Sequence, residues 1–219
     1  GLPAVRAFFS RSCVMPESIA PPENSKDLRI VLEHDDCSCF QPLLQTGFFI
    51  RTTSGTTVLE FLLRDLKLSR KVVDDDIQTV FLNGRAVDEM AEAWVQDGDI
   101  LALSAALPGL VGATFRREGF FASMRSSVTL QGQSGVKAGG KPALVRVKLF
   151  NLLVRTLGPL ILAQGVLVYE EELLDMLFEA AFLHSCTGIL INGERVPPIP
   201  EDLAGRFSQG ELIRLRLEA

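Results

Sequence analysis

The 219-residue chain has an ordinary globular composition, with 47% hydrophobic and 22% charged residues. Its formal net charge of −5 argues against broad nucleic-acid binding, because binding along phosphates needs a basic face that displaces counterions. Four cysteines are too few for a disulfide-rich secreted domain, so we expect reduced thiols and a cytoplasmic location. The most apolar stretch, 147–168, is interrupted by Arg155 and by Gly158-Pro159, so we expect no membrane span.

The first structured elements are expected after an irregular N-terminal arm at 1–26, where proline and small polar residues recur. Branched and aromatic residues predict strands at 28–32 and 48–52. Thr57 and Glu60 then have the spacing of a helix capping box, and the apolar residues that follow recur at helical spacing. This pattern predicts an amphipathic helix after the second strand.

Two turn signals follow this helix. Asn83-Gly84 tolerates positive φ and ends a predicted strand at 79–82. The turn at 96–99, with sequence QDGD, precedes another predicted strand at 100–104. The order strand, strand, helix, strand, turn, strand predicts a single mixed sheet that packs on one helix.

The second half of the chain repeats this order. A strand hairpin is expected from 144–149 and 160–163, and a helix at 170–183 with three glutamates in its first turn. The ILINGERV segment at 189–196 parallels VFLNGRAV at 80–87, and the repeat is longer than a solenoid unit of about 20–50 residues. We therefore expect two copies of a whole domain.

The motif VFLNGRAV, followed by VQDGDILAL, resembles the C-terminal half of the sulfur-carrier proteins of molybdopterin and thiamine synthesis, the family of the molybdopterin-synthase small subunit. The second copy, ILINGERV with FSQGELIRL, is similar but matches more loosely. The resemblance covers about 28–112 well and 143–219 loosely. It implies the ubiquitin-like β-grasp fold of that family.

Element order and resemblance together predict an α+β protein of two tandem ubiquitin-like β-grasp domains, each a mixed sheet packed on one helix. The predicted division is an N-terminal arm at 1–26, a first domain at 27–108, a glycine-rich linker with room for an extra strand at 109–141, and a second domain at 142–219.

Sulfur-carrier chemistry, which the resemblance implies, takes place on a free C-terminal Gly-Gly that enters the partner's active site. Neither copy ends in that way, since the first is followed by PGLVG at 108–112 and the second by LEA at 217–219. A carrier would therefore require cleavage after Gly112, with Gly109 and Gly112 in its tail. The simpler interpretation is that these glycines let the chain turn.

No complete catalytic or metal-binding constellation is evident. His34, Cys37 and Cys39 form at most half of a zinc site, which needs four converging ligands, so an exposed polar loop is the expected structure. Cys186 and His184 are two positions apart and do not face each other on one helix. We therefore expect neither an enzyme nor a bound metal or cofactor.

A cluster of aromatic and basic residues within the linker has two interpretations. It forms a docking surface for an acidic partner or a small anion, or it forms an extra strand that covers a sheet edge. Its members are Phe115, Arg116, Arg117, Phe120, Phe121 and Arg125.

The function expected from these observations is a non-catalytic β-grasp protein. It would act as a protein-interaction module linked to molybdenum or tungsten cofactor synthesis or to sulfur metabolism, with a protein partner and without nucleic acid or membrane. Two alternatives are a sulfur-carrier precursor cleaved after Gly112 and a small-ligand or metal-binding domain protein. The partner's identity and the oligomeric state stay open.

Overall fold

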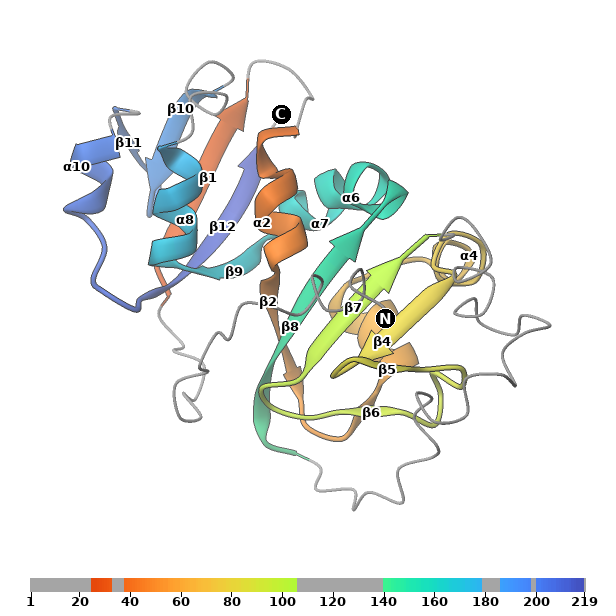
Figure 1. Ribbon diagram of the computed structural model, residues 1–219. Helices are drawn as coiled ribbons and strands as arrows, with labels where there is room; N and C mark the ends of the chain where they lie inside the picture. The colour runs from red at the N-terminus through yellow and green to blue at the C-terminus, as the bar shows by residue number, and fades with distance from the viewer. Residues whose placement is uncertain (1–24, 33–37, 106–139, 179–185, 198–199, 219) are drawn as a thin grey trace, which may run out of the picture.

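The computed structural model is an α+β fold and describes residues 25–32, 38–105, 140–178, 186–197 and 200–218 (Figure 1). Within these described ranges, ten strands join in one mixed sheet and two short ones pair separately. The large sheet comprises β1 (Asp27–Leu32), β2 (Phe48–Thr53), β4 (Thr79–Leu82), β5 (Arg85–Ala86), β7 (Ile100–Ser104), β8 (Pro142–Phe150), β9 (Val166–Tyr169), β10 (Cys186–Ile191), β11 (Glu194–Val196) and β12 (Leu212–Glu218). The separate pair is β3 (Thr56–Thr57) with β6 (Trp94–Val95).

Short helices connect these strands. They are η1 (Ser38–Phe40), α2 (Gln41–Thr46), α3 (Val58–Glu60) with its π-helical continuation η2 (Phe61–Asp65), α4 (Arg70–Asp75), α6 (Leu152–Thr156), α7 (Gly158–Gln164), α8 (Glu170–Leu177) and α10 (Pro200–Ala204). The predicted capping box is confirmed, because the Thr57 hydroxyl accepts from the Glu60 N–H and the Glu60 carboxylate accepts from the Thr57 N–H.

The sheet consists of two half-sheets with the same pattern of strand directions. The first half-sheet has the order β2-β8-β7-β4-β5 and the second has the order β9-β12-β1-β10-β11. In each, the second and third strands are parallel and every other neighbouring pair is antiparallel. A single residue pair, Phe49 with Leu167, joins β2 to β9 and so joins the half-sheets.

The central pair of each half-sheet takes one strand from each of the two sequence repeats. In the first half-sheet, β8 from the second repeat lies between β2 and β7. In the second half-sheet, β1 from the first repeat lies between β12 and β10. The strands therefore do not sort along the predicted divisions 27–108 and 142–219.

The strand registers identify equivalent positions in the two half-sheets. In the first, Arg146 pairs with Phe49 of β2, and in the second, Arg214 pairs with Leu167 of β9. The sequences agree, since LVRVKL at 144–149 corresponds to LIRLRL at 212–217. Thus β12 occupies the place of β8, and β1 occupies the place of β7.

Two asparagine turns have the same geometry in both half-sheets. Asn83 and Asn192 both have φ of 51°, and each is followed by a glycine with positive φ. This confirms the predicted Asn-Gly turns, since asparagine and glycine tolerate left-handed backbone. The Asn83 side-chain oxygen accepts from the N–H of Ile100, the first residue of β7, and the Asn192 oxygen accepts from the N–H of Asp27, the first residue of β1.

The predicted strand at 160–163 is wrong, because these residues lie in α7. Pro159 occupies a first-turn position of that helix, where its missing N–H costs nothing, and Ile161 and Leu162 are buried on one side. The strand that pairs in the sheet begins two residues after the helix ends, at Val166. The expected helix at 170–183 is present from 170 to 177, and 179–185 lie outside the described residues.

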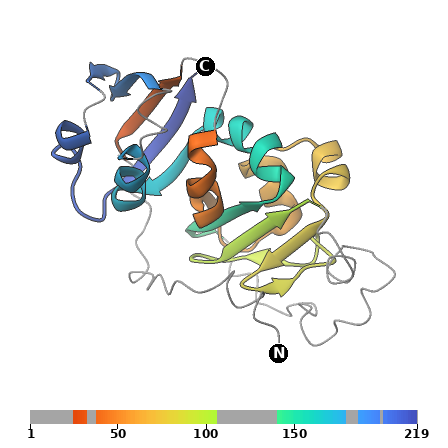
Figure 2. The same cartoon turned by 45° about the horizontal axis from the view of Figure 1, so that its top comes forward.

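One face of the sheet carries a continuous hydrophobic core that includes side chains from all the strands of both central pairs and from α2, η2, α7 and α8. A smaller cluster of Phe49, Leu144, Leu167 and Leu212 lies on the opposite face. In Figures 1 and 2, α8 lies in front of the second half-sheet, whereas the helix after β3 lies behind the first. Because the strands of a sheet twist, the core-facing side points toward the viewer in the second half-sheet and away from the viewer in the first.

Candidate functional site

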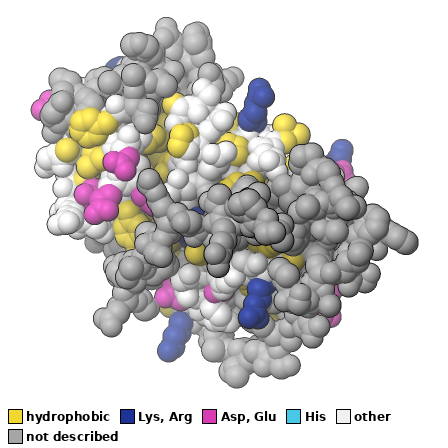
Figure 3. All heavy atoms as spheres, viewed as in Figure 1, with side chains coloured by type: hydrophobic (Ala, Val, Ile, Leu, Met, Phe, Trp, Pro, Cys, Tyr) yellow, Lys and Arg dark blue, Asp and Glu magenta, His cyan; other side chains and the backbone are white. Residues whose placement is uncertain are grey.

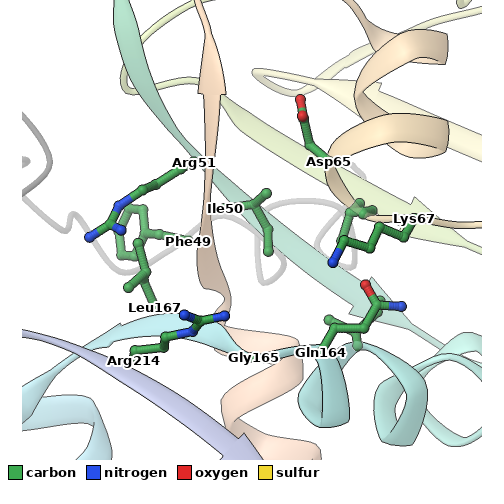
Figure 4. Close-up of a pocket in the computed structure, with 11 residues that line it drawn as sticks. Phe49, Ile50, Arg51, Asp65, Lys67, Gln164, Gly165, Leu167 and Arg214 are labelled. Atoms are coloured by element: carbon green, nitrogen blue, oxygen red, sulfur yellow. The ribbon is translucent and has the colours of Figure 1, made fainter. Parts of the chain in front are cut away.

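A pocket lies where the half-sheets part, beside the single bridge between β2 and β9 (Figure 4). Its volume is about 220 Å³. Strands β2, β9 and β12, helix α7 with the residue after it, and the end of η2 with the residues after it contribute the lining. The polar lining residues are Arg51, Asp65, Lys67, Gln164 and Arg214.

Cationic side chains dominate the pocket. Lys67, Arg51 and Arg214 are all exposed, and Asp65 is the only carboxylate among the described lining residues. Asp65 is already engaged, since it accepts from the Thr52 hydroxyl at 2.6 Å and from the Arg64 guanidinium at 2.8 Å. The pocket therefore has an excess of positive charge.

Two of these cations have no partner among the described residues. Within the described part of the chain, neither the Lys67 ammonium nor the Arg214 guanidinium forms a hydrogen bond or an ion pair. Arg51 donates to the Ser25 hydroxyl at 3.0 Å. Figure 4 shows the Lys67 ammonium near the Gln164 amide on one side of the pocket and the Arg214 guanidinium on the other, with the Asp65 carboxylate turned away.

Lys67 has an unusual backbone for its residue type. Its φ is 51°, in the left-handed region where a Cβ crowds the following carbonyl and where glycine or asparagine is preferred. The other described non-glycine residues with positive φ are all asparagines, namely Asn83, Asn151 and Asn192. The chain thus keeps a lysine at a position where a small residue would fold at lower cost.

Arg214 and its equivalent, Arg146, lie against equivalent glycines. Gly47 and Gly165 each follow a helix and precede a strand, with positive φ of 115° and 94°. A Cβ on Gly47 would lie 2.8 Å from Nε of Arg146, and one on Gly165 would lie 3.0 Å from Nε of Arg214. In both places the absence of a side chain lets a guanidinium approach the backbone.

The two arginines differ in what neutralises them. Arg146 is 4% exposed, forms an ion pair with Glu172 of α8, and lies 5.2 Å from the centre of the Phe49 ring. Arg214 is exposed and has no carboxylate in the described residues. Glu172 of α8 therefore supplies an anion at this position of the first half-sheet, whereas no described carboxylate does so at the equivalent position of the second.

Most of the sequence-predicted site residues lie outside the described residues. This applies to the expected docking cluster Phe115, Arg116, Arg117, Phe120, Phe121 and Arg125, to the expected carrier-tail glycines Gly109 and Gly112, and to the weak metal candidates His34 and Cys37. Those expectations stay predictions.

The surroundings of the two described cysteines favour a structural role over a reactive one. Cys39 is half-buried in η1 and packs against the core. Cys186 is the first residue of β10, and burial raises the pKa of its thiol, which disfavours a reactive thiolate. Among the described residues, no three His, Cys, Asp or Glu side chains are grouped so that they could hold a metal ion.

Comparison with known proteins gives no assignment. No protein-family model matches the chain, and neither a curated protein nor a solved structure matches it. In the described part of the chain, no helix has the length and apolar character needed to cross a bilayer.

Sequence reasoning missed Lys67, Arg214 and Gln164 as candidate site residues. The match between LVRVKL and LIRLRL could have marked Arg214 as the equivalent of Arg146, although only the fold shows that Arg146 has a carboxylate partner and Arg214 has none among the described residues. For Lys67 the sequence offers no such signal, because its left-handed backbone and its place at the pocket both depend on how the chain folds back.

Proposed function

We propose that the chain is a non-catalytic protein-interaction module built from two β-grasp-like units that share strands. Each half-sheet is a mixed sheet that packs on helices through one face, with an Asn-Gly turn in the place that the sulfur-carrier resemblance predicts. That resemblance also supplies the proposed class of partner, an enzyme of molybdenum or tungsten cofactor synthesis or of sulfur metabolism.

A row of arginines across the outer face of the second half-sheet carries this proposal. The strand registers place Arg195 of β11 beside Leu190 of β10, Leu190 beside Arg29 of β1, and Arg29 beside Arg216 of β12. We call Arg29, Arg195 and Arg216 the arginine row. Like charges on neighbouring strands repel, so this arrangement costs stability and favours a role in binding.

The arginine row is only partly neutralised. Asp27 and Glu218 both pair with Arg29, at 2.9 and 3.3 Å. In the described residues neither Arg195 nor Arg216 has an ion-pair partner. Arginine next to half-buried apolar groups such as Leu190 is typical of protein interfaces.

A group of three carboxylates lies on the other side of this half, away from the arginine row. Helix α8 packs on the core face and carries Glu170, Glu171 and Glu172 in its first turn. In Figure 3 one group of Asp and Glu side chains lies over α8 and others are scattered, whereas the Lys and Arg side chains in view stand apart from one another. Since the chain is acidic overall, at −5, we propose an acidic protein segment, not a nucleic acid, as the occupant of the arginine row.

The experiment compares three baits in affinity capture from native extract: the wild type, Arg195→Glu with Arg216→Glu, and Arg85→Glu as an exposed arginine on another strand. The captured protein is then purified and titrated against each bait. We expect the double variant to lose at least tenfold in affinity and Arg85→Glu to bind as the wild type does. Equal binding by all three would refute the arginine row, and a partner outside cofactor or sulfur metabolism would refute the pathway.

The carrier alternative receives less support from the strand pairing. A fragment that ends at Gly112 would lack β8, the strand between β2 and β7. The intact mass of the protein from its native host tests this alternative, since a carrier requires a fragment ending at Gly112.

A further inference from the structure

We propose that the pocket between the half-sheets binds the phosphate group of a small phosphorylated molecule, held between Lys67 and Arg214. This proposal does not depend on the arginine row, because the two sites share no residue. Four observations on the described residues lead to it: the charge of the pocket, the open position at Arg214, the backbone of Lys67, and the pocket's size.

The charge of the pocket favours a dianion. Lys67 and Arg214 have no hydrogen-bond or ion-pair partner in the described part of the chain, and the charge of Asp65 is offset by Arg64. Two unpaired cations on opposite sides of a pocket match a group that carries two negative charges. A phosphate monoester at neutral pH meets this requirement better than a single carboxylate does.

The other half-sheet shows what Arg214 lacks. At the equivalent position, Arg146 binds the Glu172 carboxylate. Arg214 has the same strand position and the same glycine beside it, but no anionic oxygen among the described residues. A ligand oxygen at Arg214 would complete the arrangement that Glu172 completes at Arg146.

The backbone of Lys67 points to a role other than stability. A left-handed residue after a helix is normally glycine or asparagine, and a lysine there costs conformational energy. A structure that tolerates such strain at the lining of a polar pocket supports a binding role for the side chain. The nearby Gln164 amide can donate a further hydrogen bond to a phosphate oxygen.

The size of the pocket limits the ligand. Its volume of about 220 Å³ lies below the range of about 300–1,000 Å³ that is usual for drug-sized ligands. Apolar side chains of Phe49, Ile50 and Leu167 line the rest of it. This leaves room for a phosphate group with a short carbon chain.

The test measures binding of defined anions by isothermal titration calorimetry at pH 7.5 and constant ionic strength. The probes are inorganic phosphate, glycerol 3-phosphate, glycerol and acetate. We expect glycerol 3-phosphate to bind at least as tightly as inorganic phosphate, acetate to bind at least tenfold more weakly, and glycerol not to bind. If inorganic phosphate binds tenfold more tightly than the ester, the assignment to a phosphorylated molecule is wrong. If acetate binds as tightly as glycerol 3-phosphate, the requirement for two negative charges is wrong.

The variants are Arg214→Gln, Lys67→Gly and, as a matched control, Arg85→Gln. Each pocket variant should lower the affinity for glycerol 3-phosphate at least tenfold, and the control variant should leave this affinity unchanged. Lys67→Gly should also raise the midpoint of thermal unfolding, by roughly 2–4 °C, because it relieves the left-handed strain. A more stable variant that binds less separates ligand binding from folding. If no phosphate binds to the wild type, or both pocket variants bind as the wild type does, the proposal is wrong.

Discussion

Asn192 is tied at both its backbone and its side chain to Asp27, which lies 165 positions earlier in the chain. The Asn192 side-chain oxygen accepts from the Asp27 N–H at 2.9 Å, and the Asn192 N–H donates to the Asp27 carbonyl at 2.8 Å. Asn83 makes the same pair of bonds with Ile100. One asparagine thus fixes where a central strand begins in each half-sheet: Asn83 for β7 and Asn192 for β1.

Replacement of Asn192 by alanine should destabilise the protein by about 2 kcal/mol, because it removes one hydrogen bond and places a Cβ in the left-handed region without a compensating side chain. Asn192→Gly keeps the backbone freedom and loses only the hydrogen bond, so it should cost less. Urea unfolding of the two variants measures the difference. If alanine and glycine cost the same, the backbone conformation is not what the asparagine provides.

Replacement of Leu28 by alanine tests where β1 belongs. Leu28 is completely buried, and its truncation should cost about 2–5 kcal/mol. Because β1 lies between β10 and β12, amide exchange should accelerate at Ile191 and Leu215. The amides of Leu82 and Leu103 in the first half-sheet should stay protected. The opposite pattern, with faster exchange at Leu82 and Leu103, would place β1 with its neighbours in sequence.

Replacement of Glu172 by glutamine should destabilise the protein by about 3 kcal/mol. It leaves the Arg146 guanidinium, which is 4% exposed, without its counter-charge, and buried unpaired charges cost about 3–5 kcal/mol. The 21% exposure of the Glu172 side chain places the expected cost at the lower end. The double variant Arg146→Met with Glu172→Leu removes both charges and should lose less. Thermal and urea unfolding provide the comparison, and a double variant that is less stable than Glu172→Gln would contradict it.

Asp99 predicts a pH dependence of stability. Burial raises the pKa of this carboxyl, although the Asn83 amide and the Gln96 N–H donate to it. A raised folded-state pKa means that the folded state holds the proton more tightly, so this contribution to stability is full below the unfolded pKa of about 3.9 and is lost as pH rises through the folded pKa.

Asp99→Asn cannot titrate and retains an oxygen that accepts hydrogen bonds. We therefore expect the variant to be more stable than the wild type at pH 7, and its advantage to shrink as pH falls toward 3. Urea unfolding of both proteins across this range measures the difference directly. A difference that stays constant with pH would show that Asp99 does not ionise differently on folding.

The features that the sequence predicts well are local ones. The Thr57 capping box and the Asn83 and Asn192 turns each depend on a few adjacent residues, and all three are confirmed. The strand at 160–163 is wrong because a short apolar run fits helix and strand equally, and Pro159 decides for the helix.

Strand partners are harder to predict, because they depend on contacts between distant segments. The turn at 208–211 does match the turn at 96–99, since Ser208 N–H donates to Glu211 as Gln96 N–H donates to Asp99. By this local match, β12 is the sequence equivalent of β7. In the sheet, however, β12 occupies the position that β8 occupies in the first half-sheet. The candidate pocket follows from this exchange, since Arg214 reaches it only from that position.

The position of β1 has a consequence for the order of events during synthesis. On the ribosome, every strand of the first half-sheet has emerged once β8 has been made, so this half can close while translation continues. Strand β1 is the first of the described strands to be made, but it lacks its two neighbours until β10 and β12 have also appeared. Such long-range closure slows folding, and it leaves an apolar strand without partners for most of translation. We therefore expect chaperones to bind the nascent chain more than the folded, full-length protein.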